Sequence, residues 1–216
     1  MENSIRCYIL KNMRASYAYA LLGIGFLILI GGIFFGSSKE ESLSSNSSSS
    51  PMETFTLTSS AFENGATIPS KYTCDGDRTL SPPLSISGIP EGTISLALVM
   101  DDPDVPKARR PDGFFDHWVV YDILPPEGGG VLQIPEGAMI GIAGLNSAGE
   151  ATYTGPCPPS EFKPSEHRYF FKLYALSGTV NFVTAPTKQE LLDAIEGQVI
   201  ENVALMGRYK RNAKSI

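Results

Sequence analysis

Short apolar runs, separated by polar segments rich in proline and glycine, mark strands in the second half of the chain. Residues 94–100 (ISLALVM) form one such run and end in two aspartates, the pattern of a buried strand that leads into a loop. Aromatic and β-branched residues fill 115–124 and 167–176 in the same way. Because irregular segments such as 125–130 separate these runs, the pattern predicts a mainly β fold, an antiparallel β-sandwich.

One helix is predicted in the C-terminal part of the chain. Residues 187–190 (TKQE) form a capping box, in which a threonine side chain and a glutamate three positions later satisfy the first free amides of a helix. Leu191, Leu192 and Ile195 then supply an apolar face. Gly197 is expected to cap the C-terminal end.

The longest apolar stretch lies near the N-terminus. Residues 15–35 contain no charge over 21 positions, and a helix of that length crosses the hydrocarbon layer of about 30 Å. A signal-peptide core is shorter, about 7–15 residues, and small residues follow it. Phe34 and Phe35 stand where those small residues would be. We therefore expect an uncleaved signal-anchor, a transmembrane helix over residues 15–36, with a cleaved signal peptide and a buried core helix as alternatives.

Charges around this segment predict its orientation. Arg6, Lys11 and Arg14 precede it, which places residues 1–14 in the cytoplasm and the C-terminal domain outside the membrane. Residues 37–51 are dominated by serine and are expected to form a flexible linker to a domain that spans residues 52–216. From residue 52 onward the chain has 13 basic and 20 acidic residues, a balance that argues against nucleic acid as a partner.

Candidate chemistry centres on the two histidines of the chain, His117 and His167. Side chains alternate along a strand, so His167 and Tyr169 should share a face, whereas His117 and Trp118 should point to opposite faces. Imidazole and phenol groups donate hydrogen bonds, and protonated imidazole attracts anions. The histidines therefore predict a pocket for a small anion, such as phosphate, whose binding weakens as the pH rises.

Two proline-rich loops are expected to hold the walls of this pocket at a constant shape, because proline fixes the backbone angle φ. The first runs from Asp102 through Pro103 and Asp104 to Pro106, just past the end of a predicted strand. The second, residues 155–159 (GPCPP), comes shortly before His167.

These motifs together resemble the phosphatidylethanolamine-binding protein family. The match consists of DPDVP at 102–106, HW at 117–118, GP at 155–156 and HRY at 167–169, in family order. The segments CDG at 74–76, SPPL at 81–84 and GPCPP are similar to its bacterial and archaeal branch, the Raf-kinase-inhibitor-like proteins. The resemblance covers roughly residues 54–211. It implies a β-sandwich with a C-terminal helix and an anion pocket formed by Asp102, His117, Gly155, His167 and Tyr169, framed by Pro103 and Pro156 and supported by Asp104 and Pro106.

Three functions compete for these residues. The first is a protein that binds a phosphate-like headgroup, as the resemblance implies. The second is an inhibitor or regulator of a protease or kinase that acts through the rim of the pocket. The third is a metal-dependent hydrolase using His117, His167 and Asp102. Because neither histidine has a metal-type local spacing and no nucleophile elbow or P-loop occurs, we expect a binding protein without catalytic residues, metal or cofactor.

The cysteines leave one question open. Cys74 and Cys157 lie in the part of the chain expected outside the membrane, where disulfides form, whereas Cys7 lies on the cytoplasmic side. They can be paired, or they can be two buried thiols that pack as small apolar groups.

Overall fold

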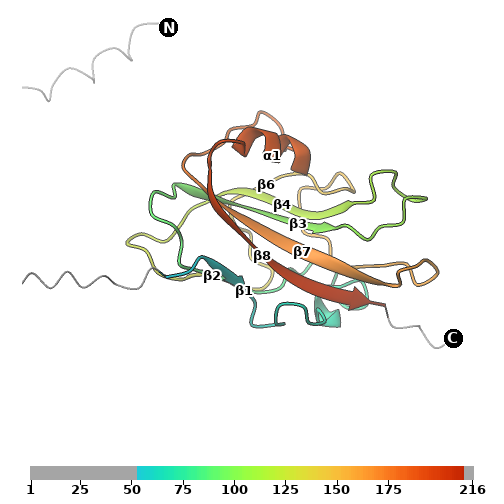
Figure 1. The fold of residues 1–216 in the computed structure, drawn as a ribbon. Helices are drawn as coiled ribbons and strands as arrows, with labels where there is room; N and C mark the ends of the chain where they lie inside the picture. The colour runs from blue at the N-terminus through green and yellow to red at the C-terminus, as the bar shows by residue number, and fades with distance from the viewer. Residues whose placement is uncertain (1–52, 212–216) are drawn as a thin grey trace, which may run out of the picture. The chain divides into compact units, whose positions relative to one another are not determined.

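A five-stranded antiparallel sheet is the central layer of the structure, a computed structural model that describes residues 53–211 (Figure 1). Its strand order is β6-β4-β3-β7-β8. The predicted strands at 94–100, 115–124 and 167–176 are confirmed as the three central ones. The bounds are β3 Ser95–Asp102, β4 Phe115–Ile123, β6 Ile142–Ala143, β7 Glu166–Leu176 and β8 Val199–Lys210.

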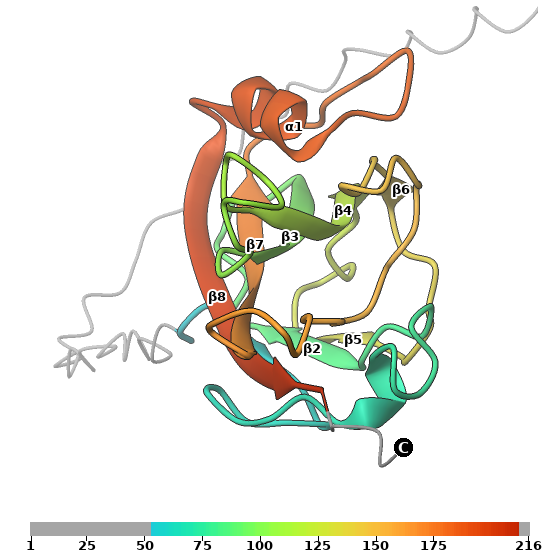
Figure 2. The same cartoon turned by 90° about the vertical axis from the view of Figure 1, so that its right-hand side faces the viewer.

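A second, smaller sheet lies against one face of the first (Figure 2). It consists of β1 (Thr56–Thr58), β2 (Leu84–Ser87) and β5 (Leu132–Ile134), in the order β1-β2-β5, and all of its pairings are antiparallel. A short 3-10 helix, Ser70–Tyr72, precedes β2. Buried apolar side chains of both sheets form the main core, which confirms the predicted antiparallel β-sandwich.

The helix α1 (Lys188–Ile195) covers the other face of the large sheet (Figure 2). Thr187 and Glu190 make the predicted capping box, and Gly197 follows the C-cap residue with a φ of 78°. Leu191 and Ile195 are buried in a second core, against the sheet. The Lys188 ammonium forms ion pairs with Asp101 and Asp116 at the ends of β3 and β4, so charge as well as apolar packing attaches the helix.

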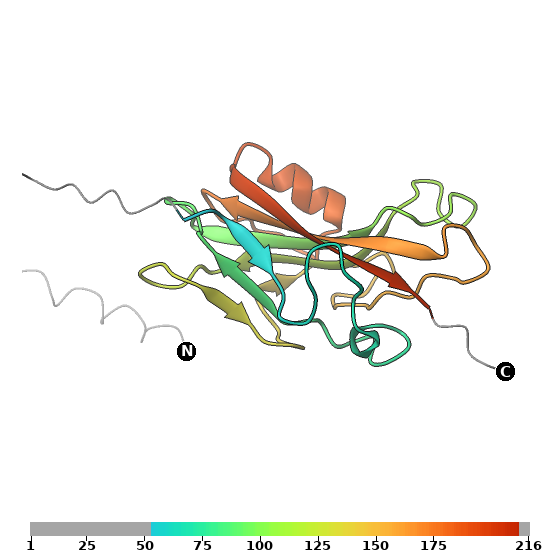
Figure 3. The same ribbon diagram turned by 60° about the horizontal axis from the view of Figure 1, so that its bottom comes forward.

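Strand β8, the longest in the structure, is an edge strand that the apolar pattern did not reveal. It pairs with β7 along its whole length, from Glu166 opposite Lys210 to Leu176 opposite Val199 (Figure 3). Its first residues are exposed, and only Leu205, Gly207 and Tyr209 are buried. Its core-facing positions include a glycine, Gly207, and its outer face carries Ala204 and Met206, so apolar and polar residues do not alternate cleanly in the sequence. The predicted helix therefore precedes a final strand.

The predicted transmembrane helix at 15–36 and the linker at 37–51 lie outside the described residues. Within residues 53–211, no helix is both long and apolar enough to cross a bilayer.

Candidate functional site

A cavity of about 460 Å³ opens at one end of the sandwich, where β3 ends and where β4 and β7 begin. Loops 103–114 and 154–159 enclose it. Its lining residues are Arg78, Asp102, Val105, Pro106, Arg109, Arg110, Phe115, His117, Thr154, Gly155, Cys157, Pro158, Pro159 and His167. A second hollow, of about 560 Å³, lies at the other end of β4 and is lined mostly by apolar side chains. The first cavity is therefore the candidate site, because it gathers ionisable and hydrogen-bonding groups.

His167 and Asp102 form a hydrogen-bonded pair in this cavity. The Nδ1 atom of His167 donates to Oδ2 of Asp102 across 2.7 Å, and both side chains are almost fully buried. The other carboxylate oxygen of Asp102 accepts the backbone amide of Asp104 at 2.8 Å. Because the carboxylate fixes the Nδ1 proton and the ring orientation, Nε2 is the atom left for other partners. Among the described residues, that buried Nε2 has no hydrogen-bond partner.

Asp104 holds the loop that carries Asp102. Its carboxylate accepts hydrogen bonds from the backbone amide, Nε and an NH2 group of Arg168, at 2.7–2.9 Å. The Arg168 guanidinium accordingly lowers the pKa of Asp104 below its ordinary value. Arg168 points away from the cavity, whereas the adjacent His167 points into it. Strand β7 therefore supplies one side chain that lines the cavity and another that holds loop 103–114 in place.

His117 sits in a β-bulge, which corrects one prediction. Met100 pairs with Trp118, but the next residue of β3, Asp101, pairs with Asp116, so β4 has one extra residue at His117. The side chains of His117 and Trp118 consequently point to the same side of the sheet rather than to opposite sides. The His117 ring meets Tyr169 edge to face, and Trp118 meets Tyr153 in the same manner.

The chain also fixes the tautomer of His117. Its Nδ1 atom donates to the carbonyl oxygen of Thr154 at 2.6 Å, since a carbonyl oxygen can only accept. Burial lowers the pKa of His117 below its ordinary 6.5. The neutral ring therefore carries its proton on Nδ1 at pH 7. Below about pH 6.5 the unfolded chain binds the proton more readily than the native one, so His117 costs stability as the pH falls.

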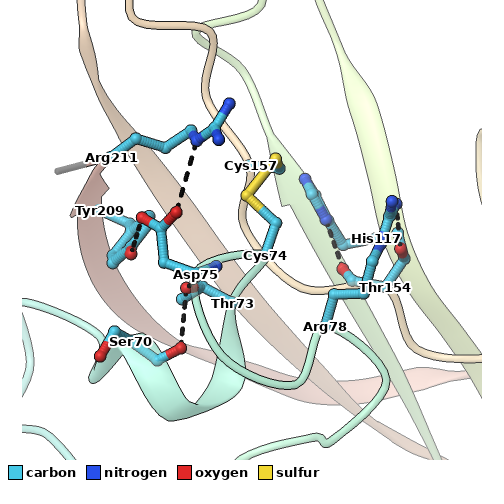
Figure 4. Close-up of a disulfide and its surroundings, with 10 residues drawn as sticks. All are labelled: Ser70, Thr73, Cys74, Asp75, Arg78, His117, Thr154, Cys157, Tyr209 and Arg211. Carbon is cyan, nitrogen blue, oxygen red and sulfur yellow. Dashed lines mark hydrogen bonds and ion pairs between the residues drawn. A yellow bond between two sulfur atoms is a disulfide. The ribbon is translucent and has the colours of Figure 1, made fainter. Parts of the chain in front are cut away.

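The wall of the cavity that adjoins His117 is built from two segments far apart in sequence (Figure 4). The amide of Gly155 donates to the carbonyl oxygen of Arg78, and the amide of Cys74 donates to that of Pro156. A Cβ atom at Gly155 would overlap the backbone of Tyr72, which explains glycine at this position.

A disulfide joins the same two segments. Cys74 and Cys157 are bonded, with a Cα–Cα distance of 5.3 Å, so of the two alternatives left open by the sequence the structure shows the pair (Figure 4). Next to the disulfide, Oδ2 of Asp75 accepts a hydrogen bond from the Tyr209 hydroxyl. The other carboxylate oxygen of Asp75, Oδ1, lies 3.6 Å from Nε of Arg211. Cys157 also lines the cavity, so the bond fixes the position of the wall itself.

The structure brings five predicted site residues to the cavity, namely Asp102, Pro106, His117, Gly155 and His167. The remaining four are not among its lining residues, namely Pro103, Asp104, Pro156 and Tyr169. Tyr169 is fully buried, and its hydroxyl has no hydrogen-bond partner among the described residues. Burial raises the pKa of Tyr169, so its phenol stays protonated at physiological pH.

Sequence reasoning missed three arginines in the lining, Arg78, Arg109 and Arg110. Two of them adjoin each other in the same proline-rich loop as Asp102, which is a signal that the sequence did contain. Arg78 reaches the site from a distant segment, where its guanidinium donates to Oγ1 of Thr154 at 2.9 Å. The cavity thus combines two imidazoles with three guanidinium groups, a donor set suited to an oxyanion.

No group of three or more metal-ligating side chains occurs within residues 53–211. The fold and the site together define a class of protein: an antiparallel β-sandwich with a cavity at the end of its central strands that is lined by three arginines and two histidines.

The family follows from comparison with known proteins. The model of the phosphatidylethanolamine-binding protein family matches residues 58–210, and the chain belongs to this family. A UPF0098 protein of Chlamydia trachomatis is 44% identical over 157 residues, which cover 72% of this chain and 99% of the relative. One of Methanothermobacter thermautotrophicus is 40% identical, over 72% of this chain and 98% of the relative. These relatives place the chain in the bacterial and archaeal branch.

Solved structures agree with this assignment. A phosphatidylethanolamine-binding protein homologue from Chlamydia trachomatis superposes with a TM-score of 0.66 at 43% identity, over 73% of this chain and 98% of that one. YbcL of E. coli, described as a new member of the mammalian phosphatidylethanolamine-binding protein family, superposes with a TM-score of 0.61 at 27% identity. The match covers 73% of this chain and 99% of YbcL.

Proposed function

We propose that this protein binds a small phosphate-type anion in the cavity between loops 103–114 and 154–159. The buried Nε2 atom of His167, which has no partner among the described residues, is the observation that carries the proposal. A polar atom shielded from water costs free energy unless it is hydrogen-bonded. Because Nδ1 already donates to Asp102, the ring donates from Nε2 to a ligand oxygen when it carries both protons, a form that a bound anion favours. The cavity volume falls within the range of about 300–1,000 Å³ typical of small-molecule pockets.

Charge supports the same ligand class. The domain as a whole is acidic, yet three of the fourteen lining residues are arginines and one is a carboxylate. That carboxylate, Asp102, already accepts hydrogen bonds from His167 and Asp104. The charged side chains that line the cavity are therefore mostly positive, whereas those of the domain as a whole are mostly negative. Calorimetric titration of the purified protein with inorganic phosphate tests the proposal: we expect saturable one-to-one binding, and its absence would refute the function.

Binding should take up a proton through the histidines. His117 is neutral in the free protein at pH 7, and a bound anion would stabilise its charged form and raise its pKa. Affinity for sulfate, whose charge stays constant between pH 6 and pH 8, is expected to be at least about threefold higher at pH 6. Sulfate separates this effect from the titration of phosphate itself. A sulfate affinity that is equal at both pH values, or a slope that persists in His117→Gln and His167→Gln, would contradict this role.

The membrane anchor belongs to the proposal as well. Residues 15–36 would hold the domain at the outer face of the membrane, with the serine-rich linker as a tether. Protease added to intact cells should cut within residues 37–51 and release the domain. A domain that is protected in intact cells and cut only after lysis would reverse the orientation.

A further inference from the structure

The hollow of about 560 Å³ at the other end of β4 is a groove between the edges of the two sheets. Strands β5 and β6 are the last strands of their sheets and lie on the same side of the sandwich (Figure 2). The groove is lined by residues 132–134 of β5, residues 140–142 at β6 and residues 122–124 at the end of β4. Among the described residues, no further strand pairs with the outer edge of β5 or β6.

These edges leave backbone groups open to pairing. Strand β6 pairs only with Val120 and Tyr121 of β4, so the outer edge of residues 122–124 extends beyond it. Open edges are templates for an added strand, and proteins commonly block them with lysine. Residues 122–142 contain no lysine or arginine. Because β5 has three residues and Pro135 follows it, the stretch available for pairing is short.

Apolar side chains are exposed along the groove. Leu124 and Ile142 line it and are 70% and 50% exposed, and Val131, next to β5, is 49% exposed. Exposed apolar side chains that gather in one place mark an interaction site. The groove therefore offers both backbone pairing and apolar contacts to a partner.

The charge at this end of the sandwich is negative. Strand register brings segments 88–94, 122–131, 177–182 and 196–202 together here, and they contain five acidic residues and no lysine or arginine. The acids are Glu91, Asp122, Glu127, Glu196 and Glu201. Within residues 53–211, none of the five forms an ion pair. A partner with positive charge complements this surface.

Asp122 brings one of these charges into the groove. It is a lining residue, and its buried Oδ1 atom has no hydrogen-bond partner among the described residues. Its φ of 51° lies in the left-handed region, as for no other described residue except glycines. Such backbone strain is often found at functional sites. A cationic group in the groove would give this carboxylate the partner that it lacks.

From these observations we infer that the groove binds an extended segment of another protein, one that alternates apolar residues with lysine or arginine. Its backbone pairs with β5 as a fourth strand of the small sheet, its apolar side chains contact Leu124 and Ile142, and one cation pairs with Asp122. A second copy of this domain is disfavoured, because two acidic faces repel each other. The inference is independent of the proposed anion binding, since cavity and groove lie at opposite ends of β4.

Short synthetic peptides test the inference on the full-length protein. A six-residue peptide of alternating lysine and valine should bind at least about tenfold more tightly than one of alternating lysine and serine, which keeps the charge and loses the apolar contacts. Fluorescence anisotropy of the labelled peptides measures both affinities. Equal affinities would mean that the peptide is held by charge alone, and the inference would be wrong.

Hydrogen exchange followed by mass spectrometry tests the mode of binding. An added strand takes up backbone amides, so fragments that contain residues 132–134 should exchange more slowly when the lysine–valine peptide is bound. Loop 103–114, at the opposite end of the domain, should exchange at an unchanged rate. Binding without slower exchange at β5 would contradict strand addition.

A pair of variants tests the contact with Asp122. Asp122→Asn should weaken peptide binding at least about threefold. Asparagine also tolerates a positive φ, so the backbone is retained. Glu201→Gln removes the same charge from an exposed residue of β8 that does not line the groove, and it should have a smaller effect. Equal losses in the two variants would overturn the role of Asp122.

Two other occupants of the groove are distinguished by exchange of the protein without peptide. Slower exchange of residues 122–142 in phosphatidylcholine vesicles than in detergent would assign the groove to the bilayer. Slower exchange as the protein concentration rises would assign it to a second copy. Either result would overturn the inference.

Discussion

Replacing both Cys74 and Cys157 by serine is expected to lower the free energy of unfolding by about 4–5 kcal/mol. The two residues are 83 positions apart, so the bond removes much of the entropy of the unfolded chain. In a domain of this size the loss corresponds to a fall in melting temperature of roughly 8–20 °C. Guanidinium denaturation of both proteins without reductant measures it.

The wild-type protein treated with a dithiol reductant is the matched control, because it loses the bond without losing a side chain. It should unfold at nearly the same denaturant concentration as the double variant. Phosphate affinity should fall in both, since Cys157 lines the cavity and Cys74 holds the facing segment. The full chain has three cysteines, so one free thiol counted in the unfolded, unreduced wild-type protein is expected, and three would show that the bond is not formed.

His167→Ala is expected to weaken phosphate binding about 10- to 100-fold. The substitution removes the Nε2 atom assigned to the ligand, and a hydrogen bond to a charged group contributes about 1.5–3 kcal/mol. It also leaves the buried carboxylate of Asp102 without its imidazole partner, which adds an unscreened negative charge beside the anion. Calorimetric titration with phosphate at pH 7 measures the change, after circular dichroism has shown that the variant is folded.

Lys172→Ala is the control for this variant. Lys172 lies on the same strand, and it pairs with Asp101 on the face covered by α1 rather than lining the cavity. The Lys172→Ala substitution therefore removes a positive charge without removing a contact to the ligand, and the affinity for phosphate should change by less than about threefold. Equal losses in both variants would mean that His167 acts only through the general charge of the domain.

Much of the fold could be predicted because its central strands are buried on both faces. All eight residues of β3 are buried, and so its apolar run is unmistakable in the sequence. The helix was predictable from its capping box, since that signal is local. By contrast, β8 mixes apolar and polar residues on both of its faces, and β6 has two residues, so neither gives a clear periodic pattern in the sequence.

The residues of the site also divide into those that the sequence predicted and those that it did not. Histidines on strands beside proline-rich loops pointed to Asp102, His117 and His167, and these three meet in one cavity. The bulge at His117 could not be predicted, because it depends on how β3 and β4 align rather than on either sequence alone. Arg78 was missed for a related reason: only the contacts among Arg78, Thr154 and Gly155 bring residue 78 to the site.

The central claim is that a phosphate-type anion occupies this cavity, and the position of a bound anion tests it most directly. Tungstate is a tetrahedral dianion similar to phosphate and scatters X-rays anomalously, so a crystal soaked in it locates the binding site. We expect one strong anomalous peak in this cavity, adjacent to Arg78 and placed so that an oxygen of the tungstate lies within hydrogen-bond distance of Nε2 of His167. A crystal in which tungstate binds elsewhere, with no peak in this cavity, would contradict it.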